Sequence, residues 1–228
     1  MKRIALTFSV LALAAAPAFA QEAGGPNAGG YVSVFAGPVW SAGNSTGSVL
    51  FEGGARIAPH LMVFGNVGHY ANLQGDFDST VDAAATTLAD DGLDVTAGGS
   101  LPAWYGVGGL RAEIAARKHL MPYVLGGIGA AHLDPQAQIT FNGGTLPDGS
   151  SPPVGTDVTS ALMVSGTYTA PAASTAFMFT LGGGVQIPLV PHWMVDAGYR
   201  YARIAADTSL SATPLNTSAM TFGFGYRF

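Results

Sequence analysis

Cysteine is absent from the 228-residue chain, which excludes disulfide bonds, cysteine metal ligands and a catalytic thiol. Charged residues are also scarce: they form 10% of the chain, against about 25% in a typical soluble domain, while 48% of the residues are hydrophobic. After residue 20 there is no apolar run of about eighteen residues, so a transmembrane helix is excluded as well. Only helices and closed barrels satisfy every backbone hydrogen bond inside lipid, so this combination predicts a membrane β-barrel.

The N-terminal segment has the order of a secretory signal peptide. Lys2 and Arg3 precede an apolar stretch, and small residues stand just before Gln21. We therefore expect residues 1–20 to be cleaved and residues 21–228 to form one outer-membrane β-barrel domain. The remaining chain has seven basic and fourteen acidic residues, a net charge of −7, which argues against nucleic acid as a partner.

Eight segments have the period of two that is typical of β-strands. The C-terminal segment, 220–228, is the clearest, because aromatic or apolar residues alternate there with small or polar ones. Each segment has about the 9–11 residues that a tilted membrane strand needs. An apolar face suits lipid, and a small or polar face suits a barrel interior. The pattern predicts an all-β, transmembrane, antiparallel up-and-down barrel with eight strands, the other seven being 30–39, 49–58, 61–71, 103–114, 121–132, 175–187 and 192–203.

The connections between these segments alternate in length. Short joins at 59–60, 116–119 and 188–191 are typical of periplasmic turns, and the longer joins are typical of extracellular loops. An even number of strands then brings both termini to the periplasm. The extracellular loops are predicted at 40–47, 72–102, 134–174 and 205–216.

One alternative concerns the long loop 134–174. Segments 138–141 and 161–169 alternate enough either to extend a hairpin above the membrane or to make a barrel of ten strands. Neither segment has an apolar row long enough to cross lipid, so we favour eight strands.

Three motifs resemble the opacity-type outer-membrane β-barrel family. The sequence PYVLGGIGAA at 122–131 resembles a glycine-rich strand of that family, and GYRY at 198–201 resembles its penultimate strand. The last eight residues, TFGFGYRF, are similar to the C-terminal signal that the barrel-assembly machinery reads. The resemblance implies a small outer-membrane barrel whose partners are outer-membrane lipids, lipopolysaccharide and that machinery. It also implies no single defined activity. The assembly signal maps onto Thr221, Gly223, Tyr226 and Phe228.

Three acids and four bases fall on the inward rows of the predicted strands. The interior of an eight-stranded barrel is about filled by side chains, so we expect these charges to pair as a plug, with a narrow pore as the alternative. Asp196 and Arg200 lie about 13 Å apart along one strand, so each needs a partner from a neighbouring strand, with Gln186 and Arg227 in reach. The predicted lumen network is Glu52, Arg56, Arg111, Glu113, Asp196, Arg200 and Arg227.

The predicted outer loops hold ten of the eleven aspartates and contain no Lys or Arg. Acidic loops keep an exposed surface soluble, and that is the simpler interpretation. Clustered carboxylates also suit a divalent cation, although no full twelve-residue calcium loop is present. The candidate metal ligands are Asp76, Asp78, Asp90, Asp91 and Asp94.

The function expected from these features is structural or surface-interactive: envelope integrity, adhesion, or contact with host or surface ligands through the loops. A narrow porin is the alternative. A lipid A-modifying enzyme is the third reading, because His69 and His132 approach the outer rim from strands roughly 10 Å apart. No catalytic signature accompanies the two histidines, so we expect neither an enzyme nor a cofactor.

Overall fold

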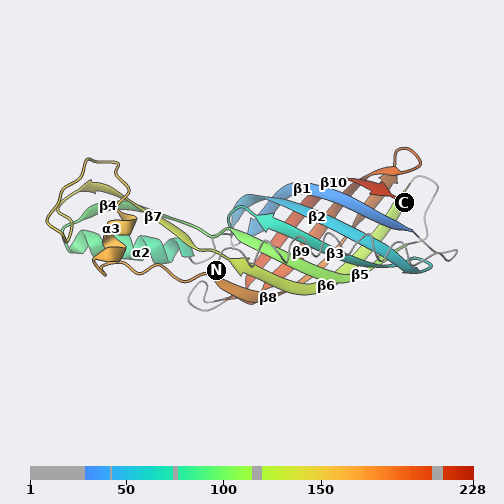
Figure 1. Cartoon of the computed structure of the whole chain (residues 1–228), viewed down its shortest axis with the longest axis horizontal. Coiled ribbons are helices and arrows are strands. Elements are labelled where there is room, and N and C mark those ends of the chain that lie inside the picture. Colours follow the sequence, from blue (N-terminus) through green and yellow to red (C-terminus); the bar gives the residue numbers. More distant parts are fainter. Residues whose placement is uncertain (1–28, 42, 74–76, 115–119, 207–212) are drawn as a thin grey trace.

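The molecule is long and narrow, with a barrel at one end and a smaller head at the other (Figure 1). The computed structural model describes residues 29–41, 43–73, 77–114, 120–206 and 213–228. The predicted signal peptide lies outside these residues.

Eight antiparallel strands close the barrel, as the sequence predicts. Their order around the barrel is β1-β10-β9-β8-β6-β5-β3-β2, so every strand is hydrogen-bonded on both edges. Closure matters because an open edge would leave backbone groups unpaired in lipid. The strands are β1 (Gly30–Ser41), β2 (Asn44–Ala58), β3 (Leu61–Tyr70), β5 (Ala103–Glu113), β6 (Met121–Leu133), β8 (Ser174–Pro188), β9 (Trp193–Ile204) and β10 (Leu215–Arg227).

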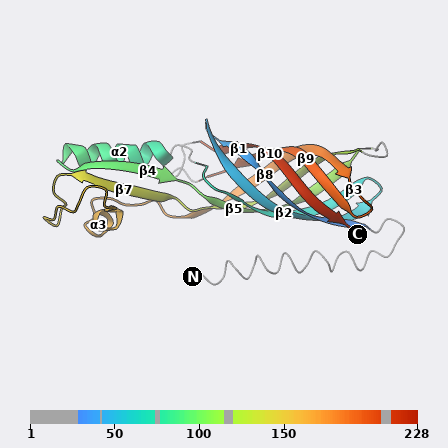
Figure 2. The same cartoon turned by 90° about the horizontal axis from the view of Figure 1, so that it is seen from above.

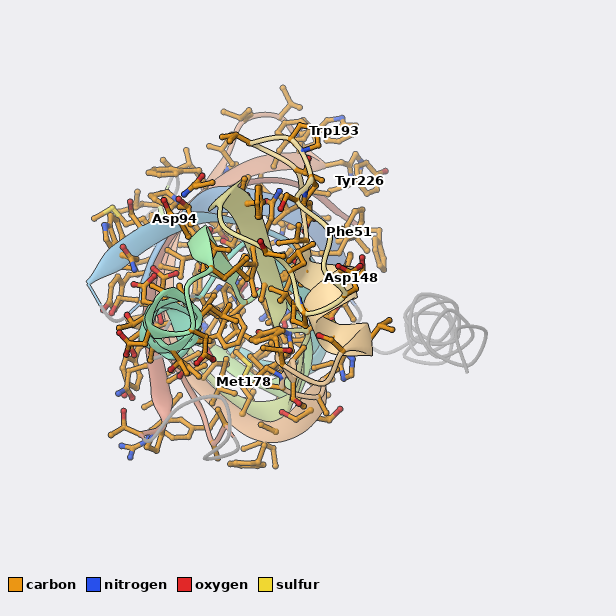
Figure 3. All side chains as sticks on the ribbon, turned by 90° about the vertical axis from the view of Figure 1, so that its left-hand side faces the viewer. Phe51, Asp94, Asp148, Met178, Trp193 and Tyr226 are labelled. Carbon is orange, nitrogen blue, oxygen red and sulfur yellow. The ribbon has the colours of Figure 1, made fainter. Side chains whose placement is uncertain are left out.

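The outer surface of the barrel is apolar. Phe51, Phe222 and Trp193 are between 43% and 60% exposed, whereas Met178 on an inward row is 1% exposed. In Figure 3, Phe51 and Trp193 lie on the periphery of the ring of strands and Met178 lies inside it. Soluble monomers rarely expose an apolar surface larger than a few hundred Å², so a belt around the whole barrel is typical of contact with lipid.

Glycines on the inward rows make room for aromatic rings in the lumen. Tyr31 lies opposite Gly54 in the ladder between β1 and β2, and Phe35 lies opposite Gly223 between β1 and β10. A Cβ atom at either glycine would overlap the ring it faces. The inward glycines therefore serve packing, because any larger residue would push these rings toward the barrel axis.

The turns lie at one end of the barrel and the long connections at the other, as predicted. Two predicted loops are shorter than expected. The segment 40–47 is mostly strand, because β1 and β2 stay paired up to Ser41 and Asn44. The last connection shortens because β10 already begins at Leu215. The predicted turn 116–119 lies outside the described residues.

The two longest loops are not structureless; they fold together into the head. The first contains α2 (Phe77–Asp90) and β4 (Asp94–Ser100), and the second contains β7 (Gln136–Gly143) and α3 (Thr159–Val164). Strands β4 and β7 pair in a separate two-stranded sheet. Figures 1 and 2 show this ribbon continuing outward from the barrel with both helices beside it. None of the described helices has the length and apolarity needed to span a membrane.

The ribbon of the head continues the pairing of β5 and β6. Ser100 pairs with Gln136, and the Asp134 N–H donates to the Pro102 carbonyl at 3.0 Å. The alternation at 138–141 thus belongs to a ribbon above the barrel, but its partner is β4 of the first long loop and not the segment 161–169 of the same loop. The barrel has eight strands rather than ten, as expected. The segment 161–169 is not a strand, because it begins within α3 and continues into a turn.

The head has a hydrophobic core of its own. Ile139 and Phe141 point from one face of the ribbon, where Leu88 of α2 and Leu162 of α3 pack against them. The opposite face is polar, and Gln138 is exposed there. A ribbon with one apolar face is stable only if that face is covered, which explains why both helices lie on the same side.

Candidate functional site: the closed lumen and the acidic head

Glu52 is the centre of the buried charge network in the lumen. Arg200 forms an ion pair with it at 2.7 Å, and Arg111 lies 3.5 Å from it. The Tyr31 hydroxyl donates to Glu52 Oε1 at 2.7 Å, and the Asn66 amide donates to Oε2 at 3.3 Å. The carboxylate thus meets two cations and two neutral donors from four other strands, which compensates its removal from water.

Arg111 lies between two aromatic rings. Its guanidinium carbon is 3.5 Å from the centroid of the Tyr123 ring and 4.9 Å from that of Tyr31. Arg111 is completely buried, and Asp196 lies 3.6 Å from its second terminal nitrogen. The Tyr123 hydroxyl donates to Asp196 at 2.7 Å. Cation–π contact and two carboxylates together stabilise a cation that no water reaches.

The other three charges form a separate group at the mouth of the barrel where the short turns lie. Glu113 accepts from Arg56 at 2.6 Å and from Arg227 at 3.1 Å. The side chains of Arg56 and Arg227 are 21% and 26% exposed, so this group is partly solvated. All seven predicted residues therefore lie inside the barrel, but as a buried group of four and a mouth group of three.

The predicted partners of Asp196 and Arg200 are wrong. The two residues do not bond to each other, as expected from their separation along β9. Gln186 lies beside Asp196 in the ladder between β8 and β9, but its amide nitrogen makes no hydrogen bond with a described residue, and Arg227 pairs with Glu113 instead. The partners come from across the lumen because long inward side chains converge at the axis of so narrow a barrel.

Sequence reasoning missed the apolar filling of the half of the lumen that lies next to the head. Leu101, Leu133 and Ile204 are completely buried there, and Leu50 and Met178 continue the same cluster toward the middle. Near the outer ends of the strands both faces are apolar, so the rule of one apolar face does not separate lipid-facing from inward residues. The cavity in this region has about 10 Å³, the room of about one water molecule.

The head is strongly acidic. Its two loops carry nine aspartates and no Lys, Arg or His. Ser150 donates two hydrogen bonds to Asp148, and Thr159 donates two to Asp157. These bonds lower the pKa of both carboxyls, so both stay ionised in mildly acidic medium. Figure 3 shows Asp94 and Asp148 on the head.

The C-terminal strand presents the predicted assembly signal in the expected orientation. Thr221 is buried in the lumen, and Tyr226 lies on the outer face beside Trp193, with ring centroids 5.2 Å apart. Phe228 is 49% exposed and exchanges two backbone hydrogen bonds with Gly30, at 2.9 and 3.1 Å. These bonds complete the seam at which the first and last strands meet.

A closed barrel of this kind agrees with the family comparison. The sequence model of one protein family, the outer membrane protein beta-barrel domain, matches residues 6–228. The chain belongs to this family. Among curated proteins, no sequence is significantly similar to it.

Solved structures of the same kind include three outer-membrane barrels. Neisserial surface protein A is 15% identical, with 87% of this chain and 97% of that chain covered and a TM-score of 0.52. The attachment invasion locus protein of Yersinia pestis is 14% identical, with 88% and 98% covered and a TM-score of 0.47. The N-terminal barrel domain of Pseudomonas aeruginosa OprF is 12% identical, with 87% and 97% covered and a TM-score of 0.42. At these identities the likeness to Neisserial surface protein A shows a shared fold.

Membership of this outer-membrane family gives a first prediction, on Phe228. Replacing Phe228 by serine should lower the amount of folded, heat-modifiable barrel in outer-membrane fractions several-fold, because the seam loses its terminal aromatic residue. Met220→Ser is the control, since Met220 is 48% exposed on the same face of the same strand. Equal yields of the two variants would contradict a role for Phe228 in assembly.

The candidate metal ligands are spread along the head. Asp78 accepts a hydrogen bond from the Gly99 N–H at 3.1 Å and so joins α2 to β4. Asp90 is the last residue of α2, Asp91 follows it directly, and Asp94 is the first residue of β4. Asp76 lies outside the described residues. Among those described, no three acidic or histidine side chains gather as a metal site would require.

The two rim histidines face outward rather than into the lumen. His69 and His132 both lie beside Trp104 in the ladders of β5 with β3 and β6, one strand on either side of it. The His69 ring is 4.6 Å from the indole, and a ring nitrogen of His132 is 2.9 Å from the Thr175 hydroxyl. Within this barrel family, such a row of rings at the rim is typical of an interfacial aromatic belt.

Proposed function

We propose that the protein is a surface-interaction barrel: a plugged barrel that anchors an acidic, folded head outside the outer membrane. The observation that carries the proposal is the joining of the two longest loops into one unit with its own hydrophobic core. A loop that served only to connect strands would not need buried residues such as Ile139 and Leu162, both 0% exposed. Loops held by a rigid scaffold are where binding residues are usually found.

The packing of the lumen supports an anchor rather than a pore. The buried charge group around Glu52 and Arg111 lies beneath the apolar cluster that ends at Leu133 and Ile204. An ion would have to cross both layers, and the central cavity has room for about one water molecule. No observation on the described residues favours the narrow porin.

The proposal includes three partners for the barrel. The apolar belt suits outer-membrane lipids, the rim suits lipopolysaccharide, and the C-terminal strand suits the barrel-assembly machinery. Export through a cleaved signal peptide at residues 1–20 is part of the proposal. The negative charge of the head argues against nucleic acid as a partner, and the proposal involves neither a cofactor nor a catalytic step.

A variant without the head tests this function. Segments 74–100 and 135–173 are each replaced by a short Gly-Ser turn, which leaves Leu101 and Leu133 in place to close the lumen. In a strain lacking the wild-type gene, cells that carry the headless barrel should remain resistant to detergent. They should no longer adhere to an epithelial cell monolayer. Unchanged adherence would overturn the proposal. In planar bilayers the wild-type protein should be silent, and conductance steps of steady size would favour the porin instead.

The orientation of the head gives a second prediction. The chain has no cysteine, so single cysteines report their own position. Val154 in the head and Val190 in the turn between β8 and β9 are 72% and 53% exposed. On intact cells a membrane-impermeant maleimide should label Val154→Cys, and Val190→Cys should react only after the envelope is opened. The reverse pattern would place the head in the periplasm.

A further inference from the structure

The head contains a groove of about 320 Å³ between α2 and the segment 167–171. This volume is at the lower end of the range of about 300–1,000 Å³ that is usual for small-molecule sites. One wall is a single stripe of α2, since its lining residues recur at helical spacing: Thr80, Ala84, Thr87, Leu88 and Asp91. The other wall is formed by Thr167, Tyr168, Thr169 and Pro171.

The groove combines an apolar floor with a rim of hydroxyl groups. Leu88 and Tyr168 are 4% and 8% exposed, and they belong to the core of the head. The threonines of both walls are exposed at the rim, with the carboxylate of Asp91 at one end. The Thr87 hydroxyl donates to the Ala83 carbonyl at 3.1 Å, which leaves its oxygen able to accept a bond from a ligand.

Tyr168 adds an observation independent of the shape. Its hydroxyl has no hydrogen-bond partner among the described residues, although the side chain is more than nine-tenths buried. Burial raises the pKa of this hydroxyl, with no neighbouring charge or hydrogen bond contributing. Buried polar groups normally have a partner, and one without a partner beside a groove points to a ligand that supplies it.

We infer that the groove binds a neutral sugar unit of a surface glycan, an inference that rests on the proposed surface-interaction function. Sugar hydroxyls both donate and accept hydrogen bonds, so they match the four threonine hydroxyls of the rim, and one of them would supply the partner that the buried Tyr168 hydroxyl lacks among the described residues. The C–H face of a pyranose ring matches the apolar floor of Ala84 and Leu88. A sulfated or otherwise anionic glycan is disfavoured, because the two loops that form the head contain no cation to pair with it.

The test uses the full-length protein refolded in a zwitterionic detergent, because detergents with sugar headgroups would compete for the groove. The probe is an array of neutral oligosaccharides built from glucose, galactose, mannose and their N-acetylamino forms, with sulfated and sialylated counterparts. We expect binding to neutral members and little binding to the anionic ones. No binding to neutral members at millimolar concentration would overturn the inference, and so would binding of basic peptides alone.

Two pairs of variants locate the site. Tyr168→Phe removes the hydroxyl and keeps the ring, and Thr87→Val removes a rim hydroxyl at nearly constant shape. Each should weaken sugar binding about fivefold to tenfold, the effect of one neutral hydrogen bond. The controls are Tyr199→Phe on the barrel and Thr86→Val, the next residue of α2, whose hydroxyl makes the same type of bond, to Asp82, outside the groove.

Resistance of the head to chymotrypsin verifies that each variant is folded. If Tyr168→Phe is no longer resistant, the site is tested with Thr87→Val alone. Equal affinities of Thr87→Val and Thr86→Val would overturn the assignment of the groove. Loss of adherence in the headless variant, with no sugar bound by the wild type, would retain the proposed function and reject the inference. Retained adherence without the head would reject the proposed function itself.

Discussion

Replacing Glu52 by glutamine is expected to lower the free energy of unfolding by about 3–5 kcal/mol, the cost of leaving buried charges without their partner. Glu52 is 2% exposed and is the carboxylate nearest to Arg200, at 2.7 Å. The glutamine would keep the shape of the side chain but leave two buried guanidinium groups facing one remaining carboxylate, that of Asp196. The measurement is the urea midpoint of the protein refolded in lipid vesicles.

Glu113→Gln is the matched control for this experiment. It is the same change on the same inward surface, but its partners Arg56 and Arg227 are partly exposed at the mouth next to the short turns. Solvent screens that group, so the loss should be clearly smaller. If the two variants unfold at the same urea concentration, the charge group around Glu52 is solvated and the lumen is not plugged.

Truncating Ile139 to alanine is expected to unfold the head while the barrel stays intact. The truncation of a fully buried aliphatic side chain costs about 2–5 kcal/mol. A head of roughly sixty residues, at about 0.05–0.15 kcal/mol per residue, has a stability of only about 3–9 kcal/mol. A large share of it would therefore be lost, and chymotrypsin should cleave the head at least about tenfold faster.

Chymotrypsin is chosen because its cleavage reports on the unfolding of the head. Trypsin has no site in the head because the loops 72–102 and 134–174 contain no Lys or Arg, whereas chymotrypsin finds aromatic residues there. The control is Gln138→Ala, the preceding residue of β7, which is exposed on the opposite face of the ribbon. Equal cleavage of the two variants would show that the head is not held by its own core. Loss of heat-modifiability in Ile139→Ala would show that head and barrel unfold together.

The barrel could be predicted from the sequence because its signals are local. Alternation along single strands, as in 220–228, assigns one face to lipid and the other to the lumen without any knowledge of the neighbouring strands. The alternation of short and long connections orders the strands, and the C-terminal aromatic residues identify the last one. The seven charged residues of the lumen were predicted from the same alternation, and every one of them lies inside the barrel.

Contacts between distant segments were beyond such signals. The partners of Asp196 and Arg200 lie across the lumen, because the closure of the barrel, rather than the ladder between neighbouring strands, decides which long side chains meet. The apolar filling was missed because both faces of a strand are apolar near its outer end. Alternation therefore cannot separate the lipid-facing residues from the inward ones there.

The head depends most strongly on tertiary structure. Its ribbon pairs 94–100 with 136–143, two segments of different loops that are separated in sequence by β5 and β6. Each segment alone is a short, weakly patterned piece within a polar loop. The sequence by itself determined an eight-stranded barrel, its faces and its ends, since strand period and lipid solvation act residue by residue. Only the tertiary structure decided how the lumen closes and that two loops form one acidic head with a groove, since both result from contacts that chain folding brings together.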